Sequence, residues 1–156
     1  MSASAPADTL ELALQIAVKA HAGQKDKSGE PYIFHPIRVM QRCSTPKAKI
    51  VALLHDTVED TDVTFEDLEE AGFDSGTLGT LRLVTHEKDV PYDNYIDALM
   101  HDPVAVEVKL ADLEDNSDIR RLKDIGAKDV ERLKKYLRTH RRLTDHKLAS
   151  VRAAAP

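Results

Sequence analysis

One short stretch of the chain, residues 51–61, holds a cluster of side chains that can do chemistry. An apolar run, Val-Ala-Leu-Leu, leads directly into His55 and Asp56, and Glu59 and Asp60 follow. In a continuous helix, His55 would lie over Glu59 and Asp56 over Asp60. An imidazole and three carboxylates at the end of a hydrophobic helix carry desolvation and repulsion costs that a bound cation would relieve. The spacing therefore predicts a divalent metal site. The competing interpretation is an ordinary solvated helix end.

Further polar side chains stand beside apolar segments elsewhere in the chain. His35 is held between Tyr32-Ile-Phe and Pro36, which is expected to begin a helix. Residues 103–116 are predicted as another helix, on which Asp112 and Asn116 share a face. The alternation of Val104, Val106 and Val108 also permits a strand, but the segment is longer than a typical strand. Taken alone, His35 is also compatible with a capping or core residue, and Asn116 with a helix cap.

The elements that must position these residues are predicted to be helices. Apolar periodicity, caps and prolines predict helices over residues 9–21, 36–40, 46–56, 65–71, 75–84, 92–100, 103–116 and 128–148. Asp8 is expected to cap the first helix and Gly23 to end it. The sequence therefore predicts one all-α domain, a helical bundle with a central metal site, over residues 9–148. Residues 1–8 are expected to be disordered and residues 149–156 to form a flexible tail.

Composition limits the class of protein. The 156 residues are 42% hydrophobic, which suits a single domain with one core. The net charge of −5 argues against nucleic acid as the main partner. Cys43 is the only cysteine and is expected to serve packing, so the sequence offers neither an internal disulfide nor a cysteine metal cage. With no signal peptide and no apolar run of about 20 residues, the sequence predicts a cytoplasmic protein without a membrane partner.

Several separate motifs, taken together, resemble a known family. Residues 20–24 (Ala-His-Ala-Gly-Gln), 28–33, 35–36 (His-Pro), 52–61, 108–112 (Val-Lys-Leu-Ala-Asp) and Asn116 occur in the order found in the hydrolase domain of the RelA/SpoT family. That domain is one of the HD-type metal-dependent phosphohydrolases, and the closest resemblance is to the stand-alone small alarmone hydrolases. Agreement of several motifs is more specific than the His-Asp-x-x-Glu-Asp pattern by itself.

The resemblance implies roles for the residues of the predicted metal site. His35, His55, Asp56 and Asp112 would bind one divalent ion, generally manganese, and this set also suits zinc or iron. Glu59 and Asp60 would position or deprotonate the attacking water. Asn116 would help to hold the reacting end of the substrate.

The residues expected to contact the substrate begin in the first loop. Lys25 and Lys27 bring positive charge to a Gly- and Pro-rich segment, where they are expected to contact phosphate, although a solvated turn would look the same. Asp26 stands where the family is expected to carry an arginine. This carboxylate would either weaken base recognition or accept hydrogen bonds from guanine.

Three later residues complete the predicted substrate set. Lys88 resembles a phosphate-contacting lysine of the family. Arg132 and Tyr136 reproduce a spacing that faces the substrate in small alarmone hydrolases, and at i and i+4 they share a helix face. The same pair also occurs on plain surface helices.

The resemblance implies hydrolysis of the 3′-pyrophosphate of a guanosine alarmone, ppGpp or pppGpp, giving GDP or GTP and pyrophosphate. Alternatives are a related phosphohydrolase acting on adenine alarmones (ppApp) or on NADPH, a non-catalytic alarmone-binding module, and a structural helical domain. Loss of metal ligands or of the acidic pair would favour a binding module, and the sequence retains all of them. The oligomeric state is not predicted.

Overall fold

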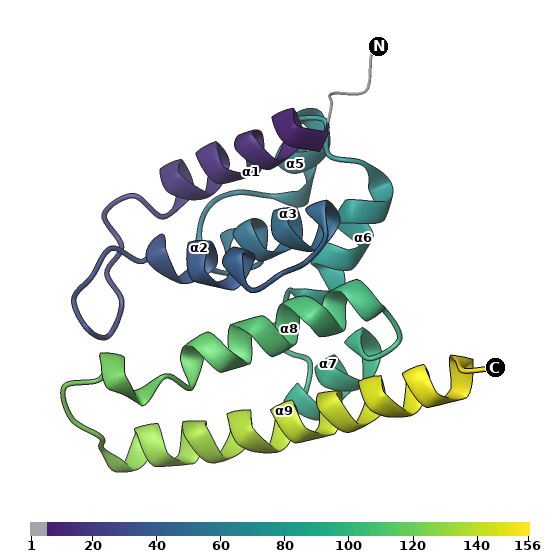
Figure 1. Cartoon of the computed structure of the whole chain (residues 1–156). Helices are drawn as coiled ribbons and strands as arrows, with labels where there is room; N and C mark the ends of the chain where they lie inside the picture. The colour runs from purple at the N-terminus through teal and green to yellow at the C-terminus, as the bar shows by residue number, and fades with distance from the viewer. Residues whose placement is uncertain (1–5) are drawn as a thin grey trace.

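The structure, a computed structural model, describes residues 6–156, with side chains from Thr9 onward. Its elements are helices: α1 (Pro6–Ala20), α2 (Phe34–Gln41), α3 (Pro46–Leu54), α4 (Thr57–Asp60), α5 (Phe65–Glu70), α6 (Ser75–Val84), α7 (Tyr92–Leu99), α8 (Pro103–Asn116), the short 3-10 helix η1 (Ile119–Arg121) and α9 (Ala127–Ala154) (Figure 1). No β-strand occurs among these residues, which confirms the predicted all-α fold. The alternating valines of residues 104–108 are helical.

Helix α3 lies at the centre of the bundle. It contacts α1, α2, α6 and α8, and six of its nine residues are buried. An all-round apolar helix of this kind can only be stable inside a core. Helix α9 packs along α8, and the two run side by side in opposite directions (Figure 1). Because α2 and α8 both contact α3, the C-terminal end of α3 lies in the middle of the molecule.

Side-chain caps explain several of the helix starts. Thr45 accepts a hydrogen bond from the Ala48 N–H before α3, with Pro46 in the first turn. A capping box of Thr64 and Asp67 is present at α5. Asp102 caps α8 by accepting from Val104 N and Ala105 N. These local signals agree with the predicted starts of α3, α5 and α8.

Both terminal helices are longer than predicted. Helix α1 begins at Pro6, so Asp8 lies inside the helix rather than at its cap, and only residues 1–5 of the predicted disordered segment fall outside the described residues. Helix α9 continues to Ala154, so the predicted flexible tail from residue 149 is wrong for most of its length. The apolar periodicity stops near Leu148, but the alanines that follow favour helix without any packing.

The chain bends where the sequence predicted one continuous helix. Helix α3 ends at Leu54, and α4 starts only at Thr57, so His55 and Asp56 lie in the turn between them. The Thr57 hydroxyl donates to the Leu54 carbonyl at 2.7 Å and so binds the last turn of α3. The predicted stacking of His55 over Glu59 on one helix is therefore wrong. The bend holds the buried His55 and the partly buried Asp56, and the exposed Glu59 and Asp60 follow on α4.

Two further expectations concern the core and the membrane. Cys43 is buried and its thiol contacts the Val39 carbonyl, as expected for a packing residue. Among the described residues, no helix combines the length and the apolar character that a bilayer span requires.

Candidate metal centre and substrate pocket

The four predicted metal ligands converge on one point. Asp112 Oδ1 lies 3.1 Å from His35 Nε2 and 3.4 Å from His55 Nε2. Asp56 Oδ2 lies 3.1 Å from His55 Nε2 and 3.6 Å from His35 Nε2. The two Nε2 atoms are 3.3 Å apart. Helix α2, the α3–α4 turn and α8 each supply at least one of these residues, so the fold assembles the site from three separate parts of the chain.

The hydrogen bonds of the two imidazoles show that this set fits a cation. His35 Nδ1 faces Asp115 Oδ2 at 2.7 Å, and His55 Nδ1 faces the Ala52 carbonyl at 2.6 Å. Both partners are acceptors, so Nδ1 carries the proton in each ring and the Nε2 lone pairs point toward each other. Two lone pairs and two carboxylate oxygens then face one another in a buried site. A divalent ion with nitrogen and oxygen ligands satisfies all four atoms.

The electrostatics of the site favour a positive charge at its centre. Burial opposes protonation of His55, but Asp56 and Asp112 outweigh it and raise the pKa of that imidazole well above its usual value. Burial likewise tends to raise the pKa of Asp56, yet His55 lowers it to about 2. Both carboxylates are therefore ionised at neutral pH and require a positive partner.

Neighbouring side chains hold the two ligand carboxylates in place. The Tyr32 hydroxyl donates to Asp56 Oδ2 at 2.5 Å. The Lys109 ammonium donates to Asp112 Oδ2 at 2.8 Å, and the Asn116 amide donates to Asp112 Oδ1 at the same distance. Asn116 thus shares a face with Asp112 as predicted, and in this structure it orients a ligand carboxylate.

An open pocket of about 480 Å³ leads to this cluster, and His35, Asp56 and Asp112 lie in its wall. Positive side chains from several elements line it: Lys25, Lys27, Lys109, Arg121 and Arg132. A pocket with this many cations around a metal-type cluster suits a ligand with several phosphate groups.

Most of the predicted substrate residues reach the pocket, but one does not. Asn116, Arg132 and Tyr136 line it together with Lys25 and Lys27. Lys88 is exposed on the loop after α6 and is absent from the pocket wall. Its placement does not match the predicted phosphate contact. That loop instead approaches the site through its backbone, because His86 N donates to Glu59 Oε1.

Glu59 and Asp60 lie at the rim of the cluster. Oxygens of Asp56, Glu59 and Asp60 come within 4.8 Å of one another. Partial burial raises the pKa of Glu59, and the nearby Asp56 and Asp60 raise it further. Burial and Asp56 also raise the pKa of Asp60. Only Glu59 of this pair lines the pocket, so Glu59 is the better placed of the two for proton transfer.

The carboxylate of Asp26 is used within its own loop. Its Oδ1 accepts from Ser28 N at 2.9 Å, Ser28 Oγ at 2.7 Å and Glu30 N at 3.0 Å. Burial opposes ionisation, but these donors outweigh it and lower the pKa of Asp26. Its Oδ2 lies 3.5 Å from Arg121 Nη1. Asp26 therefore shapes a tight turn, and it also lies in the pocket wall. The two sequence hypotheses for this carboxylate, weakened base recognition and hydrogen bonding to guanine, stay predictions.

Three residues with close contacts at the site were not predicted from the sequence. Lys109 is buried beside Asp112, Asp115 orients His35, and Arg121 lines the pocket from η1. Lys109 lies three residues before Asp112, so helix periodicity alone could have identified it. Nothing in the local sequence indicates that Asp115 meets His35, because 80 residues separate them.

Known proteins similar to this chain include several that are named for one hydrolase activity and others that are named GTP pyrophosphokinase or diphosphokinase. The chain is 36% identical over 122 residues to a guanosine-3′,5′-bis(diphosphate) 3′-pyrophosphohydrolase of Aquifex aeolicus, covering 70% of this chain and 17% of that protein. It is 40% identical over 99 residues to the corresponding enzyme of Danio rerio, covering 58% of this chain and 54% of the relative. No protein-family model matches.

A solved structure supports the same relationship. A metazoan orthologue of SpoT that hydrolyses ppGpp superposes with a TM-score of 0.71 at 28% identity, over 92% of this chain and 88% of that one. The bacterial relatives are much longer: the chain spans 17% of the A. aeolicus protein and 14% of a GTP pyrophosphokinase of Streptomyces coelicolor.

Proposed function

We propose that this chain belongs to the RelA/SpoT family of alarmone hydrolases and that it hydrolyses the 3′-pyrophosphate of ppGpp or pppGpp, on the strength of its similarity to proteins with that activity. Water adds to the phosphorus next to the ribose 3′-oxygen, and the bond between that phosphorus and the 3′-oxygen breaks. The 3′-oxygen takes up a proton, and the products are GDP or GTP and pyrophosphate.

His35, His55, Asp56 and Asp112 would hold a divalent ion, for which we propose Mn²⁺. When bound, such an ion supplies Lewis acidity, which lowers the pKa of a water molecule and offsets phosphate charge. Two imidazoles and two carboxylates suit a borderline cation and leave room for further oxygen ligands.

The residues around the ion would supply proton transfer and charge. Glu59 faces the pocket and is held by His86 N, so its carboxylate can accept a proton from the attacking water. Its raised pKa brings it closer to neutral pH, which favours that role. Asp60 lies further from the pocket and would act through its charge on Glu59.

The cations of the pocket would bind the diphosphate groups. Lys25 and Lys27 extend from the first loop, and Arg132 lies on α9. Arg132 also pairs with Asp129, which fixes its guanidinium near the pocket. Tyr136, one turn further along α9, offers a ring face against which a base or ribose can pack.

One observation carries the proposal: ligand atoms of four residues, two imidazoles and two carboxylates, converge at the wall of a cation-lined pocket. The experiment is a screen of hydrolysis with added Mn²⁺, using ppGpp, ppApp and NADPH with product identification. Release of pyrophosphate and GDP from ppGpp is expected. Turnover of NADPH alone would replace this function with the related phosphohydrolase activity.

The preference between guanine and adenine alarmones tests whether the Asp26 carboxylate recognises the base. Since its carboxylate is occupied by Ser28, Glu30 and Arg121, Asp26→Ala should weaken binding of ppGpp and ppApp alike by disordering the loop. The ratio of kcat/KM for the two alarmones is expected to stay the same. A lost guanine preference in Asp26→Ala would instead assign base recognition to this carboxylate.

A further inference from the structure

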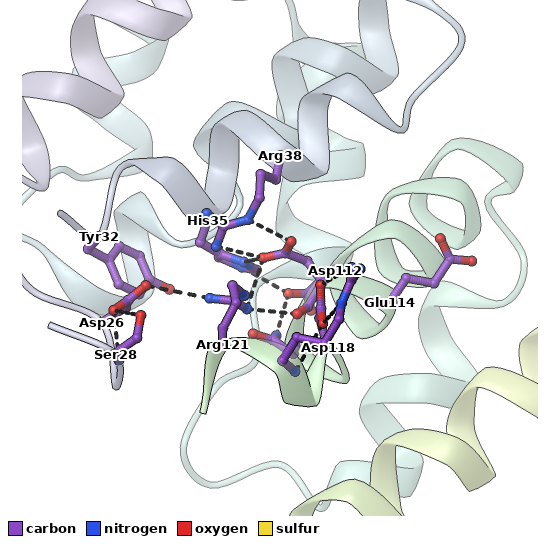
Figure 2. A network of polar contacts seen from close by, with 12 residues as sticks. Asp26, Ser28, Tyr32, His35, Arg38, Asp112, Glu114, Asp118 and Arg121 are labelled. Atoms are coloured by element: carbon purple, nitrogen blue, oxygen red, sulfur yellow. Dashed lines mark hydrogen bonds and ion pairs between the residues drawn. The ribbon is translucent and has the colours of Figure 1, made fainter. Parts of the chain in front are cut away.

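A second polar cluster lies directly behind the metal ligands, around the buried carboxylate of Asp115. Only 1% of this side chain is exposed. Figure 2 shows three of its neighbours, His35, Arg38 and Arg121, grouped in one polar network from α2 and η1. Its oxygens lie 2.7 Å from His35 Nδ1, 2.7 Å from Arg38 Nε, 3.2 Å from Arg42 Nη1 and 3.2 Å from Arg121 Nη2.

This arrangement makes Asp115 a junction between elements. Asp115 lies on α8, Arg38 on α2, Arg42 at the end of α2 and Arg121 on η1. Burial alone would raise the pKa of Asp115, but His35 and Arg38 hold it well below its usual value. A buried charge costs little only while its partners remain in place, so the ionised carboxylate ties α2 and η1 to α8.

Asp115 acts on the metal ligand through the imidazole of His35. By accepting the Nδ1 proton, it leaves Nε2 as the lone-pair atom that faces Asp112. It also fixes the rotation of the ring. Carboxylate partners of this kind orient ligand histidines and increase their basicity.

Asp115 also acts on the first loop, through Arg121. Arg121 Nη2 donates to the Asp115 carbonyl at 2.7 Å and lies 3.2 Å from its Oδ2. Arg121 Nη1 lies 3.5 Å from Asp26 Oδ2, and Asp26 holds the turn through Ser28 and Glu30. The same loop carries Lys25 and Lys27 to the pocket, and Figure 2 shows Asp26 and Ser28 of this loop beside Arg121.

We infer that Asp115 is a positioning residue that sets both His35 and, by way of Arg121 and Asp26, the loop of residues 23–32. The inference rests on the proposed function for its meaning, since it joins the metal site to the substrate-binding loop. It predicts that two variants differ in which properties they lose. Asp115→Asn disturbs metal binding and the loop together, whereas Arg121→Gln disturbs the loop and leaves His35 oriented by Asp115.

The test compares Asp115→Asn and Arg121→Gln with Glu114→Gln, which loses the same charge one position away on the exposed side of α8. Mn²⁺ binding is measured by calorimetry, and loop order by amide hydrogen exchange of residues 23–32. Asp115→Asn should bind Mn²⁺ on the order of 10- to 100-fold more weakly. Arg121→Gln should keep wild-type Mn²⁺ affinity but exchange faster in the loop, and Glu114→Gln should change neither.

A folded Asp115→Asn protein with wild-type Mn²⁺ affinity would overturn the inference, and so would an unchanged loop in Arg121→Gln. If Asp115→Asn does not fold, nitrogen NMR of the wild-type protein with diamagnetic Zn²⁺ decides whether Asp115 orients His35. A protonated Nδ1 in His35 supports the inference, and an unprotonated Nδ1 contradicts it. None of these measurements uses alarmone turnover, so a failure of the proposed function would be seen separately, in the hydrolysis screen.

Discussion

The two ligand histidines are oriented by different kinds of partner. His55 Nδ1 lies against the backbone carbonyl of Ala52, which no side-chain substitution removes. His35 Nδ1 depends on the Asp115 side chain. Of the two histidines, only His35 is therefore expected to lose the partner of its Nδ1 when a side chain outside the ligand set is substituted. The ligand substitutions themselves should act alike.

Substituting a ligand should abolish both metal binding and turnover. His55→Ala removes a nitrogen ligand and Asp56→Ala removes an oxygen ligand from a four-residue set, so neither variant should bind Mn²⁺ stoichiometrically. Metal content and hydrolysis are measured together, with the exposed His101→Ala as the matched control. Full activity in a variant verified to be free of metal would refute the metal mechanism.

Glu59→Gln should separate metal binding from proton transfer. The amide retains an oxygen that can accept from His86 N, so the loop contact survives while the basic carboxylate is lost. Turnover should fall by on the order of 10²-fold with Mn²⁺ affinity unchanged. Steady-state kinetics and calorimetry measure the two effects, with Glu69→Gln on α5 as control. Wild-type turnover in the folded variant would leave Glu59 a structural role.

At the scale of elements, α8 contributes most to the site. It carries Asp112, Asp115 and Asn116 along its last turns, and its start is fixed by Asp102. The Thr80 hydroxyl donates to the same Asp102 carboxylate at 2.7 Å, so the cap also attaches α6 to α8. The position of the ligand carboxylate thus depends on packing and capping far from the metal.

Asp102→Ala should destabilise the protein without removing any ligand. It leaves two N–H groups at the start of α8 without their acceptor and frees the Thr80 hydroxyl. A loss of about 1–2 kcal/mol in the free energy of unfolding is expected. Urea denaturation measures it, and the exposed Asp145→Ala on α9 should change stability by less than about 0.5 kcal/mol. Equal stabilities of the two variants would remove Asp102 from this role.

At the scale of the whole molecule, the metal site connects parts of the chain that are distant in sequence. His35 on α2, the turn after α3 and Asp112 on α8 meet only in the folded state. An ion bound there stabilises the native state and has no equivalent site in the unfolded chain. Metal binding and global stability should therefore be linked.

Mn²⁺ at 100 times its dissociation constant should raise the free energy of unfolding by about 2.7 kcal/mol. Thermal unfolding with and without a chelator measures the shift. Asp56→Ala should show no shift, because a ligand is missing. A similar rise in that variant would place the stabilising ion elsewhere.

The metal-free protein should lose stability in acid. Hydrogen bonds and ion pairs lower the native pKa of Asp26, Asp74 and Asp115, so the stability they contribute is present above their unfolded pKa of about 3.8 and is lost as pH falls through the native values. Glu59 and Asp60 have raised pKa values and act in the opposite sense, so their repulsion eases as pH falls toward about 4. Urea midpoints from pH 7 to pH 2 should rise slightly and then fall. A urea midpoint that rises continuously from pH 7 to pH 2 would contradict the lowered pKa values of these aspartates.

The sequence by itself determined the helical class and most helix starts, and it pointed to four candidate ligands that the fold brings together. Thr64 with Asp67 and Pro46 after Thr45 are local signals, and they act within one turn of the residues they control. The ligands could be identified because their types and motif order are chemically distinctive. The ends of α1 and α9 were missed because intrinsic helix preference extends past the apolar periodicity.

Only the tertiary structure decided what surrounds the ligands. The pairing of Asp115 with His35 and the pairing of Asp26 with Arg121 depend on where α2, α8 and η1 pack. Lys88 failed to reach the pocket for the same reason, since its loop contributes a backbone N–H instead. Local sequence sets backbone preferences over a few residues, whereas long-range electrostatic partners are chosen by the packing of helices that are far apart in the chain.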